Sequence, residues 1–139
     1  MNTKKFFLGV IFGAIILMAT LALPTIVVDP CFHYGAPKET YLLHNQRYQN
    51  DGIIKHFEYD AIITGSSMTE NFKTTQLDSL FHTQSIKVPY SGARFKEIDQ
   101  AVNVAINTNS DLKMVIRSLD IPILDAPKDS VRYDNYLAY

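Results

Sequence analysis

Serines beside glycines or charged residues occur in three segments that could perform nucleophilic or anion-binding chemistry. The first is Gly65-Ser66-Ser67, which follows a short apolar run and precedes a segment with helical periodicity. A serine at the start of a helix lies beside free backbone N–H groups, which stabilise an oxyanion or a phosphate. It becomes a nucleophile when a base lies within hydrogen-bond reach. The alternative is structural: Ser66, Ser67 or Thr69 caps the helix.

The second and third segments add a backbone donor and charged groups. Ser91 and Gly92 precede an amphipathic segment, so that Gly92 could offer its N–H to the same anion. Arg94 could pair with a phosphate or a carboxylate. Asp120 follows the third apolar run and is either a site carboxylate or an exposed turn residue. The alternative for Ser91 and Gly92 is an ordinary loop with a helix cap.

Alternating strand and helix patterns predict the elements that must position these segments. Short apolar runs at 61–63, 85–88 and 112–116 are typical of buried strands. Residues 71–81 and 94–107 carry apolar side chains at helical spacing, most clearly in the second range. We therefore expect an α/β fold: a partial three-layer, flavodoxin-like βαβαβ unit with a parallel sheet. Ligands of such sheets bind at the carboxyl ends of the strands, where all three serine segments are expected to lie.

The N-terminal 28 residues are typical of a membrane anchor. Residues 6–28 contain no charge, and about 20 apolar residues suffice to cross the hydrocarbon core of a bilayer. Lys4 and Lys5 precede this run, so the positive-inside rule places the N-terminus in the cytoplasm and the remainder outside. We predict a single-pass signal anchor in the cell membrane over residues 1–28, with a cleaved signal peptide as the alternative.

A polar and aromatic stretch separates this anchor from the strand pattern. Residues 29–58 are interrupted by Gly35 and Pro37, which break regular structure. We predict an extracytoplasmic linker there, although a short helix over 48–57 would also fit. The α/β domain is then expected over residues 59–139.

Composition excludes several classes of function. The chain has 13 Lys and Arg against 14 Asp and Glu, so it lacks the basic excess of a nucleic-acid-binding protein. Cys31 is the only cysteine, which excludes an intramolecular disulfide framework and a cysteine-based zinc site. His33, His44 and His56 lie eleven and twelve residues apart, without metal-ligand spacing. We predict no metal and no cofactor.

The first serine segment also resembles a known family. The run Thr64-Gly65-Ser66-Ser67-Met68-Thr69-Glu70-Asn71-Phe72, with the anchor and the Ser91-Gly92 loop, resembles the SGNH (GDSL-type) hydrolase superfamily and, within it, membrane-anchored DltD-like proteins of Gram-positive bacteria. The resemblance covers the anchor and residues 59 to about 120. It implies that Ser67 is the nucleophile and that Gly92 donates an oxyanion-binding N–H. Ser66 stands where many members have Asp, a departure that DltD-like proteins share. The substrate-binding candidates are Ser66, Asn71, Ser91, Arg94 and Asp120.

Two parts of the family pattern have no counterpart in this sequence. The third strand ends in Arg117-Ser118-Leu119-Asp120, so the family's oxyanion-binding Asn is missing. No Asp-x-x-His follows, and the predicted topology does not bring His82, the last histidine, to Ser67. We therefore expect the chain to be the N-terminal part of a longer protein, truncated and inactive alone.

These observations predict an anchored SGNH-like hydrolase or acyltransferase that acts on ester or acyl groups of an envelope glycan or polymer. The alternative is a non-catalytic envelope protein that binds a partner or a glycan with the same residues. The two hypotheses differ in whether Ser67 reacts.

Overall fold

The N-terminal unit of the chain is one long apolar helix. The computed structural model describes residues 3–36, 42–43, 45–121 and 129, in two units, Met1–Pro30 and Cys31–Tyr139. The first unit contains α1 (Thr3–Val28), none of whose residues is buried. Among the described residues, α1 is the one helix long and apolar enough to cross a membrane, a property that N-terminal signal sequences share. An apolar N-terminal helix is thus confirmed, whereas its retention and its orientation in a membrane stay predictions.

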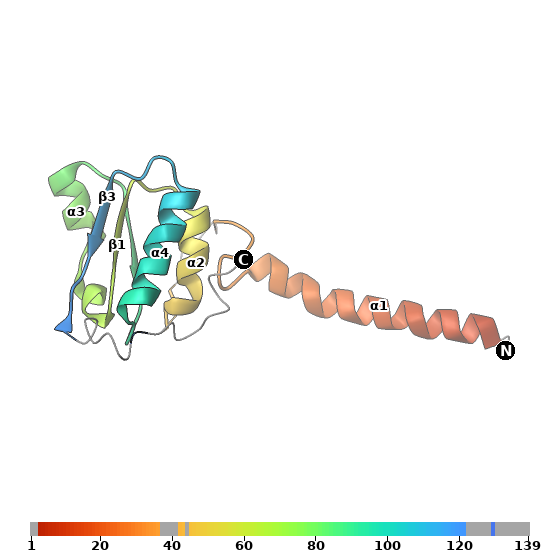
Figure 1. Ribbon diagram of the computed structural model, residues 1–139. Coiled ribbons are helices and arrows are strands. Elements are labelled where there is room, and N and C mark those ends of the chain that lie inside the picture. The colour runs from red at the N-terminus through yellow and green to blue at the C-terminus, as the bar shows by residue number, and fades with distance from the viewer. Residues whose placement is uncertain (1–2, 37–41, 44, 122–128, 130–139) are drawn as a thin grey trace. The chain divides into compact units, whose positions relative to one another are not determined.

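The second unit is an α/β fold on a parallel three-stranded sheet (Figure 1). The strands are β1 (Ala61–Gly65), β2 (Ser85–Pro89) and β3 (Met114–Arg117), in the order β2-β1-β3. Ile63 is level with Lys87 on one side and with Ile116 on the other. The helices are α2 (Arg47–His56), the 3₁₀ helix η1 (Ser67–Asn71), α3 (Thr74–Phe81) and α4 (Phe95–Thr108). The predicted βαβαβ order and the parallel sheet are confirmed, although the helix predicted over 71–81 begins only at Thr74.

Alternate residues of β1 pack on opposite faces of the sheet, as the two-residue period of a strand requires. Ile62 belongs to a core cluster with Val88 of β2 and Ile98 of α4. Ile63 belongs to a second cluster with Leu77 of α3. The helices α3 and α4 therefore cover opposite faces, and every residue of β1 is buried.

The fold begins earlier in the chain than the predicted boundary at residue 59. Ile53 and Ile54 of α2, together with Phe32, belong to the same core cluster as Ile98. Figure 1 shows α2 beside α4 on one face of the sheet. Gln49 of α2 is also fully buried. The short helix that the sequence allowed over 48–57 is confirmed. This part of the expected linker packs with α4 on one face of the sheet.

We predict that the core around α4 sets the stability of this unit. Ile98→Ala should lower the free energy of unfolding by about 2–5 kcal/mol, because Ile98 is fully buried and its removal leaves a cavity. Urea unfolding of the full chain in detergent, followed by tyrosine fluorescence, measures this loss. The matched control is Ile106→Ala on the same helix, where the side chain is 56% exposed and the change should stay within about 0.5 kcal/mol. Equal losses for the two variants would contradict the assignment of the core.

Candidate functional site

The three serine segments leave the same edge of the sheet. Gly65 of β1 is level with Pro89 of β2, and Thr64 is level with Arg117 of β3. The chain passes from β1 to β2 on one side and returns to β3 on the other side of β1. The strand order therefore reverses at β1, and the loops after β1 and β3 flank that point, where ligands of open α/β sheets bind.

The hydroxyl of Ser66 is engaged on both sides. Ser66 is the N-cap of η1, and its Oγ accepts a hydrogen bond from the Met68 N–H at 3.3 Å. The same hydroxyl donates to Oδ2 of Asp120. The backbone N–H of Ser66 donates to Oγ of Ser118 at 3.3 Å. The capping alternative is thus confirmed for Ser66, which is buried.

The carboxylate of Asp120 lies inside this cluster. It accepts from Ser66 and, at 3.5 Å, from the hydroxyl of Ser118. Ser118 is itself fixed to β1, because its N–H donates to the Thr64 carbonyl at 3.0 Å. Of the two alternatives for Asp120, the structure therefore favours a carboxylate that organises the site over an exposed turn residue.

Ser67 differs from its neighbour in having an available hydroxyl. It is exposed, and among the described residues its side chain has no hydrogen-bond partner. Thr69, the other capping candidate, is buried and donates its hydroxyl to the Ser66 carbonyl at 2.6 Å. Ser67 is therefore the hydroxyl at the end of β1 that a ligand could reach.

The loop between β2 and α4 presents Ser91 and Gly92 to solvent. The N–H of Ala93 donates to the Tyr90 carbonyl at 2.9 Å, which closes a β-turn around these two residues. Gly92 has a φ of 68°, the left-handed region that glycine adopts without strain. The N-cap of α4 is Arg94, so neither Ser91 nor Gly92 caps the helix.

Tyr90 lies buried under this loop. Burial raises the pKa of its phenol well above the ordinary range, and the neighbouring Asp51 raises that pKa further. The guanidinium of Arg47 lies 5.5 Å from the centre of the Tyr90 ring. Tyr90 therefore stays a neutral phenol near pH 7 and is unsuited to act as a base.

The remaining candidates do not complete a catalytic centre. Asn71 is exposed at the end of η1. His82 follows α3 and precedes β2, so it lies toward the opposite edge of the sheet from Ser67, as predicted. Nε2 of His56 lies 3.1 Å from the His33 carbonyl oxygen, and His44 is outside the described residues. Within the part of the chain that the structure describes, no group of His, Cys, Asp or Glu could hold a metal ion.

A cavity of about 290 Å³ borders the β2–α4 loop. Its lining is Asn45, Gln46, Glu70, Pro89 and Ser91. The cavity adjoins both candidate loops, because Glu70 belongs to η1 and Ser91 to the turn before α4. Its amide, carboxylate and hydroxyl groups suit a hydroxyl-bearing ligand better than an anion.

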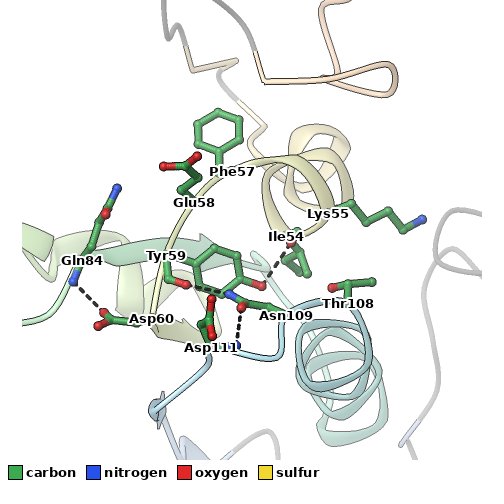
Figure 2. A pocket seen from close by; sticks show the side chains of 10 residues that line it. All are labelled: Ile54, Lys55, Phe57, Glu58, Tyr59, Asp60, Gln84, Thr108, Asn109 and Asp111. Atoms are coloured by element: carbon green, nitrogen blue, oxygen red, sulfur yellow. Dashed lines mark hydrogen bonds between the residues drawn. The ribbon is translucent and has the colours of Figure 1, made fainter.

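A larger cavity, of about 430 Å³, lies at the amino-terminal edge of the sheet (Figure 2). Two of its polar side chains are bonded to backbone carbonyls: the Tyr59 hydroxyl donates to the Ile54 carbonyl at 3.1 Å, and the Asn109 amide donates to the Tyr59 carbonyl at 2.6 Å. Lys113 and the Gln84 N–H bind Asp60 and lower the pKa of its carboxyl group. None of the predicted site residues lines this cavity, so we place the candidate site at the carboxyl edge.

Sequence reasoning missed the side chains that support the candidate loops. Gln46, Arg47 and Asn50 at the start of α2 donate to backbone carbonyls of β2 and of the loop after it. Ser118 was likewise named only as part of the segment Arg117-Ser118-Leu119-Asp120, without a role of its own. The polar residues at 46, 47 and 50 lie within one helical turn, and this spacing was the available indication.

No protein-family model, curated protein or solved structure matches this chain. The fold and the candidate site therefore rest on the geometry described above. The resemblance to SGNH hydrolases stays a prediction from the sequence motif.

We predict that the contact between β1 and the segment after β3 depends on Gly65 lacking a side chain. A Cβ at this position would meet both Ser118 and Thr69, the Cβ of the former at 2.8 Å and Cγ2 of the latter at 2.7 Å. Gly65→Ala should therefore lower the free energy of unfolding by about 1–3 kcal/mol in urea unfolding of the full chain. The control is Gly35→Ala, where a Cβ meets no atom within 4 Å and no comparable loss is expected. A Gly65→Ala chain as stable as the control would overturn the close packing described here.

Proposed function

We propose that the chain supplies the nucleophile and one oxyanion donor of an SGNH-type serine hydrolase or acyltransferase, with Ser67 as the nucleophile. The observation that carries this proposal is the contrast between two adjacent serines. The Ser66 hydroxyl is committed to Met68 and Asp120, whereas the Ser67 hydroxyl is exposed and has no partner among the described residues. A nucleophile must be accessible to its substrate and held on a fixed backbone, and Ser67 meets both conditions.

The neighbouring loop supports the same chemistry. When Ser67 attacks an acyl carbonyl, negative charge develops on the carbonyl oxygen, and a preorganised N–H group stabilises it. The Gly92 N–H has no acceptor among the described residues, and it belongs to the loop that follows the strand next to β1. The Gly92 N–H is therefore the proposed oxyanion donor, and the neighbouring Ser91 and Arg94 are the proposed substrate-binding residues.

Acyl transfer also requires a base that accepts the Ser67 proton and returns it to the leaving group. The sequence contains no Asp-x-x-His, and no histidine of the described residues forms a hydrogen bond with Ser67: His82 follows α3, and His56 lies beside the His33 carbonyl. We propose that a base from outside the described residues completes the site. In this proposal α1 anchors the chain in the cell membrane, and the substrate is an ester or acyl group of an extracytoplasmic glycan or polymer.

The absence of a base beside Ser67 among the described residues favours one other function. In that alternative the same loops, with the adjoining cavity, bind a glycan or an envelope partner without reaction. Asn71 and Asp120 would then contribute to binding or to the shape of the site. The reactivity of Ser67 separates the two functions.

We predict that Ser67 reacts covalently with a fluorophosphonate when a base is supplied in solution. The full chain in detergent is treated with the probe over a series of imidazole concentrations, and the modified serine is identified by peptide mass spectrometry. The labelling rate should rise with imidazole, because imidazole takes the role of the general base, and labelling should be absent in Ser67→Ala.

The matched control is Ser79→Ala, which removes an exposed hydroxyl on α3, remote from the candidate loops. This variant should be labelled like the unaltered chain. Labelling that persists in Ser67→Ala, or an unaltered chain that does not react at any imidazole concentration, would refute the catalytic proposal and leave the binding function.

A further inference from the structure

Three side chains from the start of α2 donate hydrogen bonds to the backbone of β2 and the loop that follows it. Nε2 of Gln46 donates to the Lys87 carbonyl at 2.7 Å, and Nδ2 of Asn50 donates to the Pro89 carbonyl, also at 2.7 Å. Nη2 of Arg47 donates to the carbonyl of Ser91, two residues after Pro89. The first two contacts fix the strand, and only the third one reaches the loop.

The contacts of the strand residues show in which direction each carbonyl of β2 points. The Val88 carbonyl accepts from the Thr64 hydroxyl, and the Tyr90 N–H donates to the Gly65 carbonyl, so these groups face β1. The carbonyls of Lys87 and Pro89 point the other way, because successive residues of a strand alternate. Gln46 and Asn50 therefore cover the free edge of β2, a position where unpaired carbonyls would otherwise invite another strand.

Arg47 makes a different set of contacts. Its guanidinium is buried and forms an ion pair with Glu97, which lies in the first turn of α4. The turn at Ser91 and Gly92 lies between β2 and α4, so Arg47 joins α2, the turn and the start of the next helix. A buried ion pair adds little net stability over apolar side chains of the same volume, whereas the loss of one partner leaves the other charge buried and uncompensated.

The peptide group between Ser91 and Gly92 contains both the carbonyl that Arg47 holds and the N–H proposed as the oxyanion donor. A trans peptide is planar, and its C=O and N–H point in opposite directions. This peptide is the centre of the turn closed by Ala93 and Tyr90, and types I and II of such turns differ by a rotation of the central peptide through roughly 180°. The positive φ of Gly92 corresponds to type II.

We infer that Arg47 is a positioning residue that locks the Ser91–Gly92 peptide with its carbonyl turned inward and the Gly92 N–H turned toward the exposed side of the loop. This inference rests on the proposed function in one respect, namely that the outward N–H binds the oxyanion. The orientation of the peptide itself is independent of any reaction. Arg47 acts through the peptide and does not touch the substrate.

The test compares two changes at Arg47 with the loss of a hydrogen bond at the other end of α2. Arg47→Met combined with Glu97→Met removes both charges, so that neither is left unpaired in the core. Arg47→Lys retains a cation beside Glu97, but an ammonium lacks the two separate donor nitrogens of a guanidinium. Tyr59→Phe is the matched control, because it removes a hydrogen bond to the Ile54 carbonyl of α2 at the opposite edge of the sheet and leaves the turn untouched.

Inactivation of the full chain by the fluorophosphonate, in imidazole and detergent, gives the first readout. The double variant should lower the maximal inactivation rate at least tenfold, with the concentration for half-maximal rate unchanged within twofold, because a misplaced donor weakens the transition state and not initial binding. Arg47→Lys should lower the maximal rate at least threefold, and Tyr59→Phe should leave it within twofold. Unchanged maximal rates in both Arg47 variants would overturn the inference, and Arg47→Lys decides alone if the double variant does not fold.

Relaxation-dispersion NMR of the Gly92 amide gives a readout that does not depend on reaction. The amide should show exchange between two peptide orientations in the Arg47 variants and none in the unaltered chain or in Tyr59→Phe. If the Gly92 amide shows no exchange in folded Arg47 variants, the positioning role is overturned, even where labelling by the fluorophosphonate falls. A chain that never labels at Ser67 refutes the proposed function alone, and the NMR comparison then still decides whether Arg47 holds the peptide.

Discussion

The carboxyl edge of this sheet depends on the contact between the end of β1 and the segment after β3. Gly65 allows the Ser118 side chain to lie against the backbone, and Ser118 then binds the Ser66 N–H while Asp120 accepts from both hydroxyls. These bonds fix the direction in which the chain leaves β1. Because η1 starts from this turn, the exposure of Ser67 follows from the same contact. A side chain at residue 65 would separate the two strands where the candidate site is formed.

Within the described residues, the rest of the chain covers the β2 edge of the sheet and leaves the β3 edge unpaired. Side chains of α2 bind the outward carbonyls of β2, and Pro89 removes a donor from the same edge. On β3, by contrast, Val115 is 39% exposed, and no described strand pairs with the outer side. A sheet this small leaves a strand edge open, and among the described residues that edge is the outer side of β3. The covered edge adjoins the loop with Gly92, so the protection of β2 and the support of the candidate loop come from one helix.

The sequence predicted the elements with apolar periodicity and missed those held by polar contacts. The three strands and α4 were predictable because Ile62, Val88 and Ile98 mark buried faces at the spacing of a strand or a helix. The role of α2 was not, because four of the seven residues that it buries are polar or charged. Asn50, for example, donates to the Pro89 carbonyl, a backbone group distant in the sequence. For the same reason the residue types alone could not decide whether Ser66, Ser67 or Thr69 caps the helix, and only the family resemblance pointed to Ser67 as the nucleophile. Which hydroxyl is committed depends on Asp120, which reaches Ser66 only once β3 has paired with β1.

The arrangement of hydrogen bonds gives the candidate site an inner and an outer side. On the inner side, Asp120 and Arg47 bind the Ser66 hydroxyl and the Ser91 carbonyl, so the charged groups next to the two loops hold the backbone in place. On the outer side, the Ser67 hydroxyl and the Gly92 N–H are left for a ligand. The Asp120 carboxylate binds the hydroxyls of Ser66 and Ser118, so Asp120 orients the turn and is not placed to activate Ser67. In the proposed hydrolase, a base for Ser67 would therefore approach from the outer side, the same side as the proposed substrate. Acyl transfer and ligand binding thus require the same rigid inner side and differ only in what meets Ser67 from outside.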